Sequence, residues 1–139
     1  MSEKSLPITK LGDESSSQHW HWGAPIKELL GRWENVFEDT KLIQAVVLEE
    51  EEGNTYIRVF GKGEVSPIDW GRQQCDVYYE AVDSNVVEGL TVTFDFEFME
   101  NLLCFNAKKG VLTIQLYCKF KDKSARQDYF GREFFIKEW

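Results

Sequence analysis

Histidine is scarce in this chain of 139 residues, which has two, His19 and His21. Both lie near the N-terminus, so the body of the chain has no imidazole to activate a serine or a cysteine. The pair also has no third metal ligand nearby, and no glycine-rich loop that could cradle a phosphate is present. Acid-base chemistry by carboxylates is the one catalytic option left, and we expect no catalytic residue, cofactor or metal.

Cysteine and long apolar runs are also scarce. The odd number of cysteines, Cys75, Cys104 and Cys118, leaves a free thiol in any disulfide scheme, and their spacing is not that of a metal site. All three lie in apolar runs, which predicts buried thiols in a reducing compartment. The first 18 residues lack the apolar region of a signal peptide, and no stretch has the length of a membrane span. We therefore expect a cytoplasmic protein with no membrane partner.

Positive charge is in deficit, because 24 acidic residues oppose 16 basic ones and give a net charge of -8. The field of such a chain repels phosphate backbones, so nucleic acid is excluded as an expected partner. Aromatic residues, in contrast, make up 14% of the chain, with five Trp and ten Phe. A chain of this length and composition predicts one ordered domain with its own core.

The two ends of the chain differ in character. Residues 1–24 are expected to form a flexible N-terminal tail, since most of them are polar and show no periodicity. Residues 25–139 are expected to form a single domain. Pro25 and Gly31 bracket a possible short helical turn at its start.

From Gly31 onwards, β-branched and aromatic residues recur in runs of six to ten, separated by short polar joints. The eight runs are Gly31 to Val36, Leu42 to Glu50, Thr55 to Lys62, Gln73 to Val82, Leu90 to Glu97, Leu102 to Ala107, Val111 to Lys121, and Arg126 to Lys137. Joints as short as Gly53-Asn54 and Glu100-Asn101 connect antiparallel neighbours. The longest joint is a loop from Gly63 to Gly71.

Strict alternation in two runs indicates strands with one buried face. In the fifth run the apolar row is Leu90, Val92, Phe94, Phe96 and Phe98, and in the seventh it is Leu112, Ile114, Leu116, Cys118 and Phe120. Eight antiparallel strands form either a sandwich or a closed barrel. The meander favours an all-β fold, an eight-stranded antiparallel up-and-down β-barrel, whose interior holds either side chains alone or one small ligand.

Gly31-Arg32-Trp33 at the start of the first strand, followed by the meander, resembles the calycins, the group of lipocalins, fatty-acid-binding proteins and avidins. The resemblance implies that Trp33 closes one end of the barrel and stacks on a basic residue of the last strand, Arg126 or Arg132. Some calycins handle chromophores or isomerise substrates, so an enzyme of that kind is implied as a weaker alternative.

Residues 33 to 136 are also similar to a family of small, uncharacterised bacterial proteins. The matching residues are Trp33 and Asn35, then Pro67, Asp69, Trp70 and Gly71 in the loop, then Tyr129, Glu133 and Phe135 in the last strand. That family often carries His and Cys before the Asp-Trp pair. This chain has neither there, so metal or thiol chemistry at the loop is not implied for it.

The loop suggests a ligand contact at the mouth of the barrel. Trp70 would form an aromatic wall and Asp69 an acceptor beside it, with Arg58, Tyr79 and Tyr117 as further contacts from strands. The alternative is that Trp70 plugs the barrel while Asp69 caps a turn.

The strand carboxylates give a weaker signal. Asp95 and Glu97 lie opposite the apolar row of their run and are expected to face water. For Glu133 both faces stay possible, because the last run carries aromatic residues on each of them.

These patterns lead to two functional hypotheses. The first is a non-enzymatic binding protein that holds a small, partly apolar molecule in the barrel or at its mouth. The second is a protein-interaction module with a filled barrel that uses its outer face and could form a homodimer.

Overall fold

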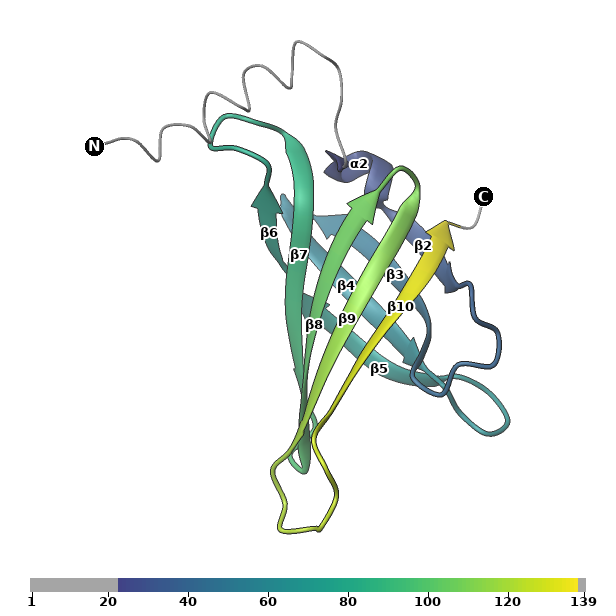
Figure 1. Ribbon diagram of the computed structural model, residues 1–139. Coiled ribbons are helices and arrows are strands. Elements are labelled where there is room, and N and C mark those ends of the chain that lie inside the picture. Colours follow the sequence, from purple (N-terminus) through teal and green to yellow (C-terminus); the bar gives the residue numbers. More distant parts are fainter. Residues whose placement is uncertain (1–22, 138–139) are drawn as a thin grey trace, which may run out of the picture.

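The computed structural model describes residues 23–137, which form one antiparallel sheet and a single helical turn (Figure 1). The elements are β1 (Ala24–Pro25), α2 (Ile26–Leu29), β2 (Gly31–Asn35), β3 (Ile43–Glu51), β4 (Asn54–Gly61), β5 (Ile68–Gln74), β6 (Asp76–Tyr79), β7 (Val86–Asp95), β8 (Met99–Lys108), β9 (Val111–Phe120) and β10 (Tyr129–Lys137). The all-β, antiparallel class predicted from the sequence is confirmed.

The strands follow the hydrogen-bonded order β1-β7-β8-β9-β10-β2-β3-β4-β5, and β6 pairs with β7 outside this path. The first long strand therefore lies beside the last, with Asn35 of β2 opposite Phe135 of β10. Figure 1 shows the sheet curled, so that β7 to β10 lie in front of β3 to β5. The sheet has ten strands where eight were expected, and its order does not close into a ring.

The chain passes from one end of this order to the other at Cys75, the one residue between β5 and β6. β5 pairs with β4, while β6 pairs with β7. The N–H of Cys75 still donates to the carbonyl of Thr55 in β4, at 2.8 Å. β5 and β6 thus follow one another directly, but each pairs with a different neighbouring strand. Trp70, which the sequence pattern places in a loop, lies in strand β5.

The core lies on the concave side of the curled sheet. Its largest fully buried side chains are Trp33, Phe94, Phe105, Phe135, Leu48, Ile57, Leu90, Leu103, Leu112, Val46, Val59 and Val87. The row predicted for the seventh run is buried from Leu112 to Cys118. Together with the buried first part of the row predicted for the fifth run, Leu90 to Phe94, it supplies the core from β7 and β9, as alternation requires.

The alternation of β7 ends earlier than the sequence indicates. Phe94 is 1% exposed, but Phe98 is 45% exposed. β7 stops at Asp95, and Glu97 turns the chain with φ 72°. Glu100 and Asn101, predicted as a joint, consequently lie inside β8, and Asn101 is fully buried.

The start of the domain matches the expected short helical turn, because α2 follows Pro25 and ends one residue before Leu30. Ala24, which we assigned to the tail, pairs with Val87 of β7. The rest of the expected tail, including His19 and His21, lies outside the described residues. Within residues 23–137 no helix has the length and apolar character needed to cross a membrane.

The three thiols are free, and Cys75 and Cys118 are buried whereas Cys104 is partly exposed. Burial, with a smaller effect of the Asp76 charge, raises the pKa of Cys75 from 9.0 to about 12. The folded protein therefore keeps a proton that the unfolded chain releases near pH 9. The contribution of the protonated Cys75 thiol to the free energy of unfolding is fully present below pH 9 and is lost as the pH rises towards 12.

We expect the free energy of unfolding to fall by about 1.4 kcal/mol for each pH unit above 9 through Cys75 alone. Urea unfolding at pH 8 and pH 10 measures this slope, and Cys75→Val should reduce it. Some slope remains in the variant, since burial also raises the pKa of the Cys104 and Cys118 thiols above 9.0. Equal slopes in the two proteins would contradict the assignment to Cys75.

Candidate functional site

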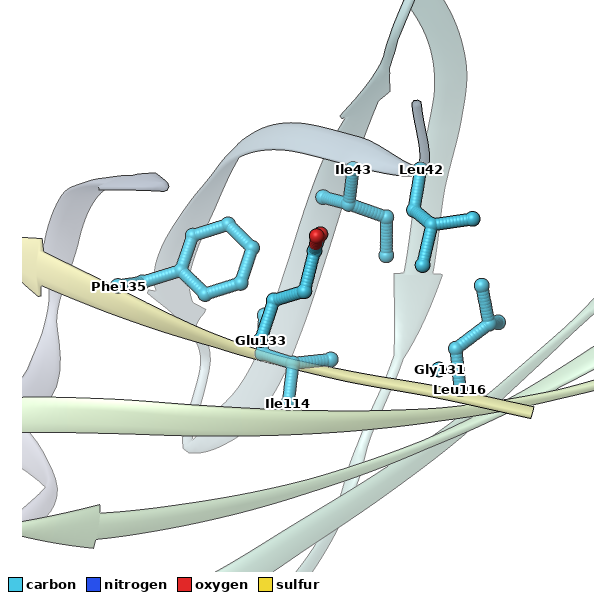
Figure 2. Close-up of a pocket in the computed structure, with 7 residues that line it drawn as sticks. All are labelled: Leu42, Ile43, Ile114, Leu116, Gly131, Glu133 and Phe135. Carbon is cyan, nitrogen blue, oxygen red and sulfur yellow. The ribbon is translucent and has the colours of Figure 1, made fainter. Parts of the chain in front are cut away.

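A pocket opens between the start of β3 and the strands β9 and β10 (Figure 2). Its lining residues are Leu42, Ile43, Ile114, Leu116, Gly131, Glu133 and Phe135. The empty space, including the part that is open to solvent, is about 180 Å³. The space in which the centre of a water molecule can lie is only about 10 Å³, about what one water needs, so the pocket can take the end group of a molecule but not a whole drug-sized ligand.

Glu133 is the one charged residue in this lining, and its carboxylate is held at a single oxygen. Oε1 accepts hydrogen bonds from Nδ2 of Asn35, at 2.8 Å, and from Oγ1 of Thr40, at 2.6 Å. Among the described residues, Oε2 has no hydrogen-bond partner, and it is not sealed from solvent. Figure 2 shows the carboxylate directed across the pocket towards Ile43. One carboxylate oxygen is thus available to a donor in apolar surroundings.

The connection between β2 and β3 fixes this geometry. Oδ1 of Asn35 accepts from the N–H of Phe37 at 2.8 Å, and its Nδ2 also donates to the carbonyl of Ile43 at 2.8 Å. Thr40 is 1% exposed, and its Oγ1 accepts from the N–H of Leu42 at 3.0 Å. The side chains that orient Glu133 therefore also fold the connection, so the carboxylate is rigidly placed.

Gly131 lets the connection approach β10 closely. A Cβ at this position would collide with Cδ1 of Leu42. Glycine therefore leaves the space that the Leu42 side chain fills, and Leu42 forms a wall of the pocket (Figure 2).

The structure separates Trp70 from Asp69, because neighbouring strand residues point to opposite faces. The Trp70 ring packs edge-to-face on Phe94 and Phe96, with centroid distances of 5.7 and 5.4 Å. Gly61 makes room for it, since a Cβ there would collide with Nε1 of the indole. Trp70 is thus part of the core boundary.

Asp69 and Arg58 lie together on the outer face, with Nη1 of Arg58 3.0 Å from Oδ2 of Asp69. Oδ1 of Asp69 accepts from the N–H of Gly71 at 2.8 Å. Their side chains are 51% and 36% exposed, and ion pairs this open to solvent contribute about 0–1 kcal/mol. Neither residue lines the Glu133 pocket.

The two tyrosines proposed as strand contacts also lie on the outside. Tyr79 in β6 is 50% exposed and Tyr117 in β9 is 44% exposed. The Tyr117 ring lies 5.1 Å from that of Phe130, while its neighbours Leu116 and Cys118 are buried. Neither tyrosine lines the pocket.

Trp33 is 2% exposed, and its indole N–H donates to the carbonyl of Leu29 at 2.9 Å. The structure brings neither expected arginine to it. Arg126 lies over the Phe120 ring at 4.3 Å, and Arg132 is exposed opposite Gln115.

The basic residue of the last strand at this end is Lys137, which pairs opposite Trp33. Its Nζ donates to the carbonyl of Glu28 at 2.8 Å. Lys137 thus anchors α2 at the end of the sheet where an arginine was expected.

Asp95 and Glu97 both face solvent, as expected from the sequence. Oδ1 of Asp95 lies 2.6 Å from Nζ of Lys121, and this hydrogen bond lowers the pKa of Asp95. No group of three or more His, Cys, Asp or Glu side chains within residues 23–137 could hold a metal ion.

The sequence pattern left the side of Glu133 open and did not single out Thr40. One signal was present: Glu133 and Phe135 share a strand face, and Phe135 is fully buried.

Comparisons of this chain with protein-family models, curated proteins and solved structures give no match.

Proposed function

We propose that this protein is a non-enzymatic binding protein whose Glu133 pocket holds a small, partly apolar molecule that carries a hydrogen-bond donor. The observation behind the proposal is the open Oε2 of Glu133 in a lining that is otherwise apolar. Binding sites commonly combine such a lining with a few fixed polar groups that orient the ligand.

The chemistry of Glu133 narrows the ligand class. An ionised carboxylate only accepts hydrogen bonds, and its bonds to cationic donors are the strongest it makes. Asn35 and Thr40 already donate hydrogen bonds to Oε1, so Oε2 is the oxygen that can accept a hydrogen bond from a ligand. A short alkylammonium ion, with an apolar body against Ile43 and Leu116, fits these features best.

The proposal includes the architecture of the binding domain. We treat β5 and β6 as one strand bent at Cys75, which reduces the long strands to eight and joins β4 to β7. The result would be an eight-stranded, calycin-like barrel with the pocket at one end. The absence of a cofactor and a cytoplasmic location remain part of this proposal.

Glu133→Gln should weaken the binding of n-butylammonium at least tenfold, because the amide is neutral and offers a donor where an acceptor is needed. Chemical-shift titration of the labelled protein measures both affinities, with n-butanol as the neutral ligand of similar shape. Glu64→Gln in the exposed loop is the matched control. Equal binding of both ligands, or no shift at Ile43 and Leu116, would contradict the proposal.

A second candidate function is a protein-interaction module, favoured by a row of apolar side chains on the outer face. Leu102, Tyr117 and Phe130 are cross-strand neighbours on β8, β9 and β10, and they are 39%, 44% and 54% exposed. Exposed apolar patches mark interaction sites. Sedimentation velocity should then show a dimer that Phe130→Ser weakens, whereas a monomer at all concentrations would count against homodimerisation.

A further inference from the structure

Asn101 stands out among the buried polar side chains. It is fully buried, and neither its Nδ2 nor its Oδ1 has a hydrogen-bond partner. Within residues 23–137 these are the only fully buried side-chain nitrogen or oxygen atoms without one. Thr40, buried to a similar degree, is hydrogen-bonded to both Glu133 and Leu42.

The position of Asn101 directs the amide into the interior. It lies on the buried face of β8, in the same row as Leu103 and Phe105. Its cross-strand neighbours are Phe94 of β7 and Cys118 of β9, which are 1% and 2% exposed. The backbone N–H and C=O groups of β7 and β9 beside Asn101 are used in the hydrogen bonds between strands. No neighbouring group therefore forms a hydrogen bond with the amide.

This arrangement calls for a partner from outside the chain. A carboxamide carries two N–H donors and a carbonyl oxygen with two lone pairs. Burying these groups without partners costs their full desolvation free energy, whereas a leucine in this row would incur no such cost. Buried polar groups of this kind in folded proteins are usually bonded to ordered water or to a ligand.

We propose that Asn101 anchors an interior site for a small uncharged group that offers a hydrogen-bond acceptor and a donor side by side. Ordered water and the carboxamide end of a small organic molecule share this chemistry. A charged group is disfavoured, because Phe94 and Cys118 provide no compensating charge. The ligand class therefore differs from the cation proposed for Glu133, and the site does not depend on that proposal.

The amide lies next to the Glu133 pocket in the sheet. Leu116, which lines the Glu133 pocket, precedes Cys118 by two residues on the same face of β9. Leu116 pairs with Leu103, and Cys118 pairs with Asn101. The Asn101 row thus lies directly beside the row that bounds the pocket.

Nuclear magnetic resonance of the full-length, ¹⁵N-labelled protein tests the proposal. If water occupies the site, the side-chain NH₂ of Asn101 should show cross-peaks to a long-lived water, and these should persist in Glu133→Gln. If an organic carboxamide is the natural occupant, acetamide should displace the water and shift the NH₂ signal. Acetamide without effect assigns the site to water.

Either of two results would overturn the proposal. The first is an assigned Asn101 NH₂ signal that shows neither cross-peaks to water nor a shift with acetamide. The second is a higher melting temperature for Asn101→Leu than for the unsubstituted protein. Removal of an unpaired amide stabilises a core, whereas removal of an occupied anchor lowers the melting temperature. The spectra of the unsubstituted protein decide the question even if the leucine variant does not fold.

Discussion

Trp33→Ala is expected to lower the free energy of unfolding by about 3–5 kcal/mol. Trp33 is 2% exposed, so the truncation leaves a large cavity between β2 and the rest of the core. It also removes the donor to the carbonyl of Leu29, which loses a buried hydrogen bond at the junction with α2. Urea denaturation followed by circular dichroism measures the loss.

Phe37→Ala is the matched control, since Phe37 is 56% exposed in the connection after β2. Surface truncations of this kind change stability by about 0.5 kcal/mol or less. A loss for Trp33→Ala as small as that of the control would show that Trp33 does not hold this end of the sheet.

Gly61→Ala is expected to destabilise the fold by about 1–3 kcal/mol, the usual range for overpacking in a core. The added Cβ would collide with Nε1 of Trp70 and lie 3.0 Å from its Cε2. The indole cannot simply rotate away, because Phe94 and Phe96 contact it edge-to-face. The Trp70 ring must therefore shift outward, which exposes it to water.

A double-mutant cycle with Trp70→Leu measures this contact directly. The leucine frees the space beside residue 61, so the double variant should be more stable than the sum of the single effects implies. Gly53→Ala is no substitute as a control, since Gly53 has φ 82° and is strained by any side chain. Additive effects within about 0.3 kcal/mol would mean that Gly61 and Trp70 do not constrain one another.

The sequence predicts the strands well where one face is buried and the other is wet. Leu112, Ile114 and Leu116 are visible as a row because each alternates with a polar or half-exposed residue. Turns were harder to place. Polar Glu100 and Asn101 suggest a joint, but the chain turns at Glu97, a residue type with no special preference for the left-handed conformation that it adopts there.

The site was predicted less well than the fold, for a physical reason. Trp70 and Asp69 attract attention as neighbours in sequence, yet a strand places them on opposite faces. Glu133 gains its role from Asn35 and Thr40, which lie 98 and 93 positions away along the chain. A single sequence gives the chemistry of each residue but not which distant side chains the curled sheet brings together.

The pairing of β10 with β2 has a consequence for how the chain is made. Phe135, fully buried, lies opposite Asn35, a partner synthesised 100 residues earlier. During translation one edge of β2 stays unpaired until the last strand leaves the ribosome, and contacts of such long range slow folding. Nascent chains stalled before residue 129 therefore present two open edges, at β9 and β2, which is the state most exposed to aggregation and to capture by chaperones.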